Sequence, residues 1–359
     1  MILEEFIANN NNWKKIIQEK PYCVEVKEDD DYILLKYSQI DSDFSKELVR
    51  ECRGVILNKE NLNVVCRPFK KFFNYGEVYA ADIDWNTARI ASKIDGSLIK
   101  VWFDNVWHIS TNGTIDAFKA ELSFGTNEFK TFGDIFTKAL EKQNIAPYFD
   151  NLNKDYTYLF EVVSPYNRIV VPYKEIDAYH IGTIETKTAK EVEVNIGVKK
   201  PKEYFFSSLK ETVNAANELP YDDEGYVVRD KNYNRIKIKS PEYLAIHRLA
   251  NNGNVSYKRI LELVLINEDS EFLTYFPEYT EAFDEVKEKL NAFLSKVKRD
   301  EKEYYRMKFN SRKSLAMWAK NKTLPSALFA LEDNKVNNCE EFVRNMRVDN
   351  LLKILGMKE

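Results

Sequence analysis

Histidine is scarce in this sequence. Only three histidines occur among 359 residues, His108, His180 and His247, and they lie far apart along the chain. A catalytic triad built on histidine, or a metal site with several imidazole ligands, is therefore not expected.

Cysteine is nearly as sparse. The four cysteines, Cys23, Cys52, Cys66 and Cys339, show no short paired spacing of the zinc-binding or redox kind. Because nothing in the sequence marks the chain as secreted, we expect reduced thiols.

Long apolar runs are also missing. None approaches the roughly 20 residues that a membrane-spanning helix needs, and the first residues, MILEEFIANNNNWKK, lack the basic start and apolar centre of a signal peptide. We therefore expect an intracellular, cytoplasmic protein that does not act in a membrane.

The chain carries no large excess of one charge. Its formal net charge is -4, which argues against a protein that wraps nucleic acid over its whole surface. A focused basic groove stays compatible with this balance, so any nucleic-acid site must be local.

What the sequence does contain is a change in its secondary-structure pattern near residue 240. Before it, short β-rich runs alternate with turns, and LIKVWFDNVWHISTNGT predicts two strands around Asp104-Asn105 followed by a turn at Asn112-Gly113. After it, Ser240 and Pro241 predict a helix start. Apolar residues then recur at helical spacing, at Phe283, Val286, Leu290, Phe293, Leu294 and Val297.

This change predicts two domains, residues 1–242 and 243–359. The first is a mixed, sheet-built domain and the second a helical one. The basic and aromatic side chains of residues 245 to 359 favour a core with a solvated face over a binding surface, and RNA recognition by this part stays open.

The stretch SKIDGSLIKV places Lys93 beside an Asp-Gly turn that leads into an apolar strand. A lysine beside a turn is most often a solvated surface residue. The chemical alternative is a nucleophile held where a ligand phosphate approaches the backbone closely. A lysine attacks phosphorus only when neutral, so this reading predicts a pKa lowered by neighbouring cations.

Such cations occur in RIKIKS. Strand alternation would place Ile236 and Ile238 on one face, and Arg235, Lys237 and Lys239 on the other. An edge strand protected by lysines against aggregation would look the same. ECRGVIL and RPFKKFFN add further basic residues next to glycine or phenylalanine, and either one also fits an ordinary surface turn.

Two carboxylates stand at unusual places. Glu161 lies inside the apolar run YLFEVV, and Glu224 lies just before GYVV. A buried carboxylate is costly unless it is paired or hydrogen-bonded. For Glu161 we favour a functional role over a structural ion pair, whereas an ordinary acidic turn is equally compatible with Glu224.

Taken in order, ECRG, RPFKKFFN, KIDGS, FEVVSPYNRIV, EGYVV and IKIKS resemble the nucleotidyltransferase motifs of ATP-dependent RNA ligases, most closely the phage RNA ligase 1 family, which repairs cut tRNA anticodon loops. The motifs span residues 51 to 240, and a weaker likeness continues through SRKSLAMWAKNK. The Lys-x-Asp-Gly core is shared with DNA ligases and RNA capping enzymes, whereas RPxxKFFN and PxNRIV are more specific to this branch.

The resemblance implies a three-step reaction with ATP, held as covalent AMP, and Mg2+ or Mn2+ as cofactors. Lys93 attacks the α-phosphate of ATP, AMP passes to an RNA 5′-phosphate, and a 3′-hydroxyl then seals the strand. The implied partner is RNA with single-stranded or broken tRNA-like ends, and no obligate protein partner is indicated. If phage-encoded, the chain would work in the host cytoplasm.

The resemblance also implies residue roles. Lys93, Lys237 and Lys239 would be catalytic, the latter two neutralising charge on the α-phosphate and lowering the pKa of Lys93. Glu224, with Glu161, would place the metal ion through water. The implied nucleotide contacts are Tyr37, Arg53, Lys71, Phe73, Ile94, Gly96, Glu161, Val227, Lys237 and Lys239, with Arg53 and Lys71 on phosphates, Glu161 on the ribose and Phe73 and Val227 beside the nucleoside.

One position departs from the family pattern. Close members carry a lysine in the segment after the hairpin, where this chain reads STNGT with Asn112. The phosphate or RNA contact of that lysine is therefore not transferred.

The implied fold is α+β: an ATP-grasp-like nucleotidyltransferase domain of antiparallel sheets flanked by helices, with ATP between the sheets, followed by an all-α C-terminal domain. DNA ligases and capping enzymes usually follow this core with a small β-barrel, which favours RNA ligase. The alternatives are a duplex-nick ligase, a GTP-using capping guanylyltransferase and a non-catalytic RNA-binding relative.

Overall fold

The computed structural model describes residues 1–122, 124–145, 149–249, 255–267 and 269–357. The chain divides into two compact units, Met1–His247 and Arg248–Glu359. None of the helices in these described ranges is both long and apolar enough to cross a bilayer.

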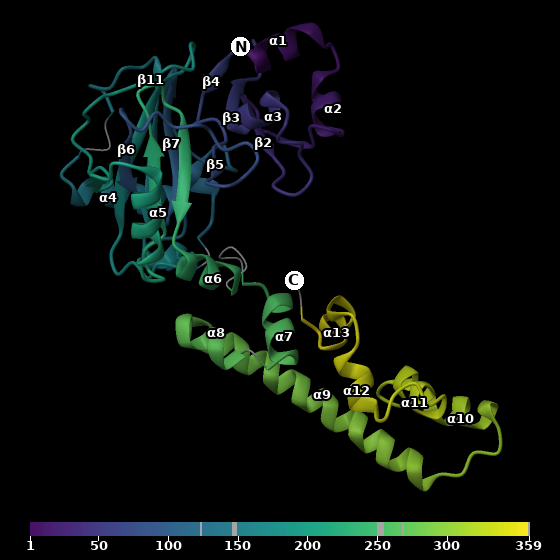
Figure 1. Ribbon diagram of the computed structural model, residues 1–359. Helices are drawn as coiled ribbons and strands as arrows, with labels where there is room; N and C mark the ends of the chain where they lie inside the picture. Colours follow the sequence, from purple (N-terminus) through teal and green to yellow (C-terminus); the bar gives the residue numbers. More distant parts are fainter. Residues whose placement is uncertain (123, 146–148, 250–254, 268, 358–359) are drawn as a thin grey trace. The chain divides into compact units, whose positions relative to one another are not determined.

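The N-terminal unit is built on three sheets in its described part (Figure 1). Their strand orders are β1-β2-β3-β4, β11-β10-β9-β7-β8 and β12-β6-β13-β14-β5. We call them the first, second and third sheet. The strands are β1 Val24–Glu28, β2 Tyr32–Tyr37, β3 Arg53–Asn58, β4 Val64–Cys66, β5 Phe73–Asn74, β6 Arg89–Ser92, β7 Ser97–Asp104, β8 Val106–Thr111, β9 Tyr156–Val163, β10 Asp177–Glu185, β11 Glu191–Val192, β12 Glu203–Tyr204, β13 Gly225–Arg229 and β14 Arg235–Lys239.

The expectation of antiparallel sheets needs one correction. Strands β5 and β14 pair in parallel, with Phe73 opposite Ile236, while the other named strand pairs are antiparallel. A long segment separates the short β5 from β14 in the chain. The two strands are therefore not joined by a tight hairpin, which would require antiparallel pairing. This pairing also places β14 between β13 and β5, which excludes the edge-strand reading of RIKIKS.

The predicted hairpin is confirmed. Strands β7 and β8 pair from Asp104 opposite Val106 to Ile99 opposite Thr111, and Asn105 between them adopts a φ of 60°. Asparagine tolerates this left-handed conformation better than most residues, so the turn is encoded locally.

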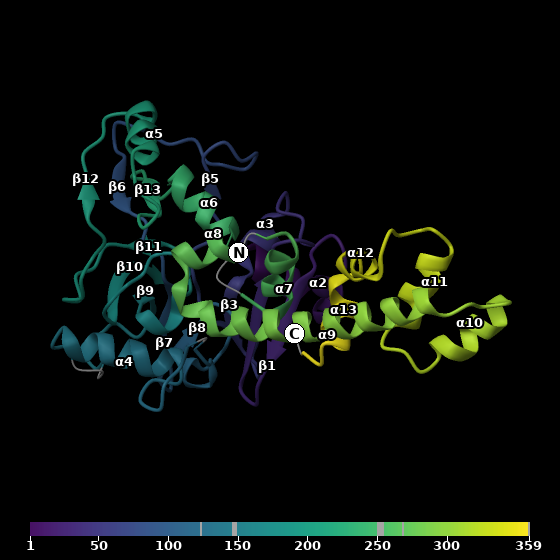
Figure 2. The ribbon, with the colours of Figure 1, turned by 90° about the horizontal axis from the view of Figure 1, so that it is seen from below.

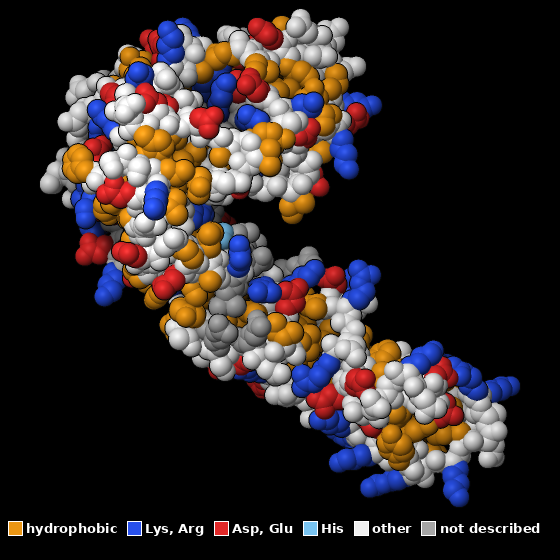
Figure 3. Space-filling view, in the orientation of Figure 1, with side chains coloured by type: hydrophobic (Ala, Val, Ile, Leu, Met, Phe, Trp, Pro, Cys, Tyr) orange, Lys and Arg blue, Asp and Glu red, His pale blue; other side chains and the backbone are white. Residues whose placement is uncertain are grey.

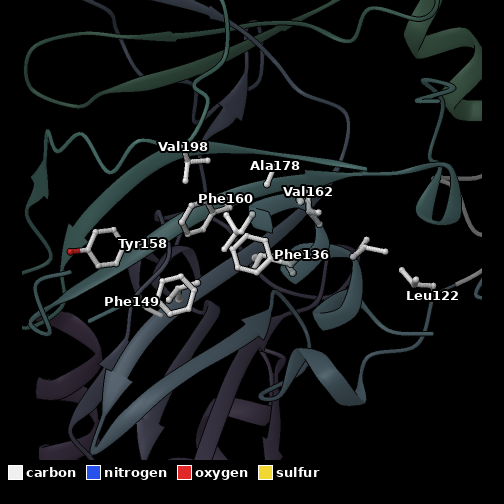
Figure 4. Packing of buried hydrophobic residues seen from close by; sticks show 13 residues of the cluster. Leu122, Phe136, Phe149, Tyr158, Phe160, Val162, Ala178 and Val198 are labelled. Atoms are coloured by element: carbon white, nitrogen blue, oxygen red, sulfur yellow. The ribbon is translucent and has the colours of Figure 1, made fainter. Parts of the chain in front are cut away.

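Helices cover the outer faces of these sheets. α4, Phe132–Lys142, begins with a capping box between Thr131 and Asp134 and lies against the second sheet (Figure 2). Its apolar face packs on Tyr158, Phe160 and Val162 (Figure 4). The other helices of this unit are α1 Ile2–Asn9, α2 Trp13–Gln18 and α3 Glu47–Glu51 near the first sheet and α5 Leu209–Asn217 on the third, with short 3-10 turns at Ala117–Lys119 and Pro165–Asn167.

In strands β9 and β14, side chains alternate between two faces of the sheet. In β9, Leu159 joins an inter-sheet apolar cluster with Phe69, Leu98 and Ile184, and Glu161 lies two residues further on the same face. In β14, Ile236 and Ile238 pack under α5, so the lysines between them point to the other side. The predicted two-faced strand is confirmed.

The predicted helix at residue 241 is also confirmed. α6 is Pro241–Leu249, and the Ser240 hydroxyl accepts a hydrogen bond from the Tyr243 N–H at 3.2 Å.

The C-terminal unit is helical in its described part. α9, Thr280–Arg306, buries Phe283, Val286, Leu290, Leu294 and Val297, which confirms the predicted amphipathic pattern, and Phe293 is half-buried. The shorter helices of this unit (Figure 1) are α7 Tyr257–Leu265, α8 Asp269–Tyr275, α10 Arg312–Ala319, α11 Pro325–Glu332, α12 Cys339–Arg344 and α13 Val348–Ile354, with a 3-10 turn at Pro277–Tyr279. α7 and α12 pack on α9, α13 packs on α7, α11 on α12 and α10 on α11.

Candidate functional site

Lys93 lies directly after β6, at the end of the third sheet. Its backbone N–H donates to the Gly225 carbonyl at 2.8 Å, which ties it to the start of β13. Its Nζ lies 2.7 Å from Oε2 of Glu224, and Lys239 Nζ lies 2.8 Å from Oε1 of the same carboxylate. Glu224 is 3% exposed and thus holds two lysines at once. We call Lys93, Glu224 and Lys239 the ion triplet.

The pKa of Lys93 differs from the sequence expectation. Burial of the amine lowers its pKa, but the carboxylates of Glu224, Glu161 and Asp95 outweigh burial and raise it above the usual lysine value. The prediction of a lowered pKa at Lys93 is therefore wrong. Spacing along β14 identified the nearby cations, whereas the carboxylates reach Lys93 from β9, β13 and the turn after β6.

The pKa of Lys237, on the other hand, is lowered. Burial, followed by repulsion from Lys93 and Arg53, lowers the pKa of Lys237 to about 7. Its Nζ lies 5.3 Å from the centre of the Phe72 ring, and the Arg53 guanidinium lies 5.5 Å from the same ring. No ion pair found among the described residues includes Lys237, so this cation is available to an anion.

Glu161 faces this cluster from the second sheet. Burial raises the pKa of Glu161 to about 7, although Lys93 opposes the shift. A carboxyl group with this pKa can hold or release a proton near neutrality. β9 therefore places a carboxyl group that titrates near neutral pH beside Lys93.

Asp95 anchors the turn that carries Lys93. One oxygen accepts hydrogen bonds from the Val170 and Val171 N–H groups at 3.0 and 2.9 Å, and the other accepts from the Tyr243 hydroxyl at 2.8 Å. Asp95 is 4% exposed, so these three donors satisfy a buried carboxylate. Sequence reasoning identified this residue only as a turn former, and its distant partners gave no local signal.

Gly96 completes the turn because a side chain has no room there. A Cβ at this position would lie 2.4 Å from the Val162 carbonyl oxygen. The glycine therefore lets the turn after Lys93 press against β9, which carries Glu161.

Aromatic rings surround the second expected phosphate ligand, Lys71. Its Nζ lies 4.2 Å from the Phe44 ring centre, 5.0 Å from Tyr37 and 5.3 Å from Phe73. Burial lowers the pKa of Lys71. Phe44 was not identified from the sequence, since it lies in a loop with no motif around it.

The remaining expected nucleotide contacts lie on or beside the strands of the third sheet. Ile94 follows Lys93 and is half-buried, and half-buried Val227 pairs with Lys237 across the third sheet. Phe73 is 6% exposed and packs against Phe44 at a ring distance of 6.1 Å. The structure thus brings together the residues predicted for the site, and their individual roles stay predictions.

Asn112, the hairpin residue noted in the sequence, lies against Gly54, next to Arg53. A Cβ on Gly54 would lie 2.5 Å from the Asn112 carbonyl oxygen, and Gly54 has a φ of +91°. From the other strand of this hairpin, the fully buried Lys100 donates to the Gly54 carbonyl. Burial lowers the pKa of Lys100 to about 8. The sequence did not single out Lys100, because a lysine in an apolar strand carries no motif.

The carboxylates of the site suit a hard divalent cation that keeps part of its water shell. Glu161 and Glu224 both act on Lys93, and they repel each other enough to contribute to the raised pKa of Glu161. Such repulsion favours a bound cation. Among the described residues, no group of three or more His, Cys, Asp or Glu side chains is arranged as a direct metal cage.

Comparison with known proteins adds independent information. A family model described as RNA ligase matches residues 51–243. A protein of Autographa californica nuclear polyhedrosis virus, whose name describes a bifunctional polynucleotide kinase/RNA ligase, is 33% identical over 268 residues, covering 69% of this chain and 38% of that protein. The RNA ligase of Rhodothermus phage RM378 is 28% identical over 309 residues, covering 68% of this chain and 69% of the phage protein.

Among solved structures, an archaeal ATP-dependent RNA ligase is similar with a TM-score of 0.47 and 12% identity, covering 70% of this chain and 67% of that one. This likeness is too weak to carry an argument. This chain spans well under half of the viral relative and about two thirds of the phage relative.

Proposed function

This chain belongs to the RNA ligase family, and from that membership we propose that it joins RNA ends in an ATP-dependent reaction, with residues 1–242 as its adenylyltransferase domain of nucleotidyltransferase fold. The observation that supports the proposal best is the ion triplet, in which the motif lysine Lys93 contacts Glu224 at 2.7 Å. A reactive amine, a buried carboxylate and flanking cations are the groups that adenylyl transfer needs.

The proposed chemistry has three balanced steps. Lys93 Nζ, after losing a proton, forms a bond to the α-phosphorus of ATP, and the bond to pyrophosphate breaks with its electron pair on the leaving group. An oxygen of an RNA 5′-phosphate then forms a bond to that phosphorus as the Lys93 N–P bond breaks and Nζ regains a proton. Finally a 3′-hydroxyl oxygen, losing its proton, attacks the activated 5′-phosphate and AMP leaves.

The raised pKa of Lys93 sets a requirement for the first step. The ammonium must lose its proton, and Glu224 Oε2 is an acceptor within hydrogen-bond distance. Glu161, whose pKa is raised to about 7, is a second carboxylate beside the same amine. A divalent cation, Mg2+ or Mn2+, bound through Glu224 and Glu161 would supply positive charge that lowers the pKa of the amine.

The other roles follow from charge and position. We assign phosphate binding to Arg53, Lys71, Lys237 and Lys239, because developing charge on phosphoryl oxygens is stabilised by fixed cations. We assign the ribose to Glu161. The nucleoside contacts are assigned to Tyr37, Phe73, Ile94, Gly96 and Val227.

For the natural substrate we propose single-stranded RNA breaks, such as cut tRNA loops, with the helical unit contributing to RNA recognition. The support is the likeness of residues 51–240 to ligases of this type and the aromatic and basic residues of the C-terminal unit. Figure 3 shows several Lys and Arg side chains projecting from that unit.

The test is a two-part assay with the full chain. We expect covalent label from ATP and magnesium in the absence of RNA, and then joining of a 5′-phosphorylated single-stranded RNA. Label from GTP alone would indicate a capping guanylyltransferase, and joining of nicked duplexes alone would indicate a duplex ligase. A folded protein that takes no label but binds RNA would be a non-catalytic relative.

A further inference from the structure

A groove lies at the far end of β14 from the ion triplet. Its cavity volume is about 540 Å3, within the range of roughly 300–1,000 Å3 that ligand pockets occupy. Its lining comes from five places in the chain: residues 50–51, residues 67–73, Tyr79 with Ala81, Ile184 with residues 189–191, and residues 232–235. Lys93 and Glu224 do not line it, so the groove is distinct from the ion triplet.

The groove carries a surplus of positive charge. Its lining includes two carboxylates, Glu51 and Glu191, against six basic side chains, namely Arg50, Arg67, Lys70, Lys71, Lys190 and Arg235. Glu191 pairs with Arg235 and Glu51 with Lys70, which accounts for both carboxylates. No ion pair found in the described part of the chain includes Arg50, Lys71 or Lys190, so these cations have charge to offer a ligand.

On the face that Figure 3 displays, basic and acidic side chains are interspersed over the N-terminal unit. The net charge of the whole chain is -4. The basic surplus is therefore local, which is the pattern of a focused polyanion site.

Aromatic rings line the same groove. Tyr79 is 40% exposed, lies 5.6 Å from Phe73 between ring centres, and has the Arg50 guanidinium 4.7 Å from its ring centre. Tyr233 also lines the groove; it is half-buried, and the Arg229 guanidinium lies 4.9 Å from its ring centre. Exposed rings fixed by neighbouring cations serve as stacking surfaces for unpaired bases, and alternating cations bind the phosphates between them.

Strand β14 connects the groove to the ion triplet. Arg235 lines the groove, Lys237 lies next along the same face, and Lys239 belongs to the triplet, with a spacing of about 7 Å between alternate residues. Phe72 lines the groove, and its ring is also contacted by Lys237. A chain of phosphates could thus follow one row of cations from the groove to Lys93.

The reaction geometry indicates which of the two RNA ends lies in the groove. In phosphoryl transfer the attacking and leaving groups lie roughly in line. The RNA 5′-phosphate must therefore approach the adenylate from the side opposite Lys93, where pyrophosphate has left. The row of cations along β14 leads from the ion triplet toward the groove. The RNA strand that carries the 5′-phosphate would therefore enter through the groove.

We infer that this groove binds the single-stranded RNA that carries the 5′-phosphate. The inference rests on the proposed function. The groove shares Lys71 and Phe73 with the proposed nucleotide site, whereas the residues assigned to the RNA strand lie outside the adenylylation motifs. Tyr79, Tyr233 and Lys190 would contact that strand, with Arg50 orienting Tyr79.

The test uses Tyr79→Ala and Lys190→Glu in the full chain. Tyr75→Ala and Lys187→Glu are the matched controls, because both residues are exposed, lie on the same loops and do not line the groove. Fluorescence anisotropy with a labelled 5′-phosphorylated single-stranded RNA measures binding, and covalent labelling with ATP in the absence of RNA measures the first step.

We expect each groove variant to weaken RNA binding about tenfold, with a shallower dependence on salt for Lys190→Glu. The controls should bind as the unmodified protein does, and all four variants should take covalent label at its rate. Unchanged RNA binding by both groove variants would overturn the inference. So would a raised ATP requirement with intact RNA binding, because the groove would then belong to the nucleotide.

The two proposals fail separately. If the unmodified protein takes no label from ATP, the proposed function fails, whereas the anisotropy comparison between groove and control variants still decides whether the groove binds RNA. If it takes label and binds RNA equally with and without the groove substitutions, only the groove assignment fails.

Discussion

Lys93 Nζ and Glu224 Oε2 lie 2.7 Å apart, and the second oxygen of the same carboxylate is 2.8 Å from Lys239 Nζ. This arrangement raises the pKa of the proposed nucleophile and favours its ammonium form.

Replacing Lys93 tests the nucleophile directly. We expect Lys93→Ala to abolish covalent label from ATP, because no other group there forms the N–P bond. Lys93→Arg should do the same while keeping a cation beside Glu224, which separates loss of chemistry from loss of the ion pair. Gel detection of labelled protein measures both, and persistent label in either variant would contradict the assignment.

Lys237 and Lys239 are expected to act on the rate. Alanine at either position should slow adenylylation on the order of 10²-fold or more, since a fixed cation at the α-phosphate is lost. Lys231→Ala, on the nearby β13–β14 turn, is the control and should leave the rate unchanged. Peptide mapping should still find the label on Lys93; label on Lys237, whose pKa is lowered to about 7, would reassign the nucleophile.

Glu224→Gln separates two roles of the carboxylate. If Glu224 helps to place the divalent cation, the variant should need more magnesium for half-maximal labelling and should label more slowly, on the order of 10²-fold. Titrating magnesium at saturating ATP measures this. A faster variant with the same magnesium requirement would show that Glu224 only restrains Lys93.

The two groups with pKa values of about 7 predict how stability changes with pH. Glu161 titrates at about 7 when folded and at 4.5 ordinarily, so the folded state binds more protons between these values and its contribution to stability falls as pH rises through them. Lys237 titrates at about 7 against 10.5, so the unfolded state binds more protons there and stability rises with pH between 7 and 10.5.

Thermal unfolding of single variants isolates these contributions. Glu161→Gln should reduce the loss of stability between pH 4.5 and 7, and Lys237→Met should reduce the gain between pH 7 and 10.5. Lys237→Met should also stabilise the free protein at pH 7, by about 1 kcal/mol or more, because a buried charge is removed. Lys231→Met, which is exposed, should do neither.

Asp95 predicts a stability effect of a different kind. Asp95→Ala removes the acceptor for the Val170 and Val171 N–H groups and the Tyr243 hydroxyl. Leaving three buried donors unpaired should lower the free energy of unfolding by about 3 kcal/mol, whereas Asp95→Asn keeps most acceptors and should cost about 1 kcal/mol. Denaturant unfolding measures both, and equal costs would mean that the turn does not depend on this anchor.

The local structure around the site could be predicted from the sequence. The hairpin at Asn105, the two-faced strand of residues 235–239 and the helix after Ser240 follow from short-range rules of turn chemistry, alternation and capping. The family motifs, read in order, likewise pointed to Lys93, Glu161, Glu224, Lys237 and Lys239 before any distance was known.

The pKa values of the site's lysines and carboxylates could be obtained only from the tertiary structure. Whether the pKa of Lys93 is raised or lowered depends on where Glu224, Glu161 and Asp95 lie in space, and they come from segments up to 131 residues from Lys93. The sequence names the charged groups and their faces, because alternation and turns are local properties. Their balance is set by burial and by distances of a few ångströms across two sheets, which no local pattern encodes.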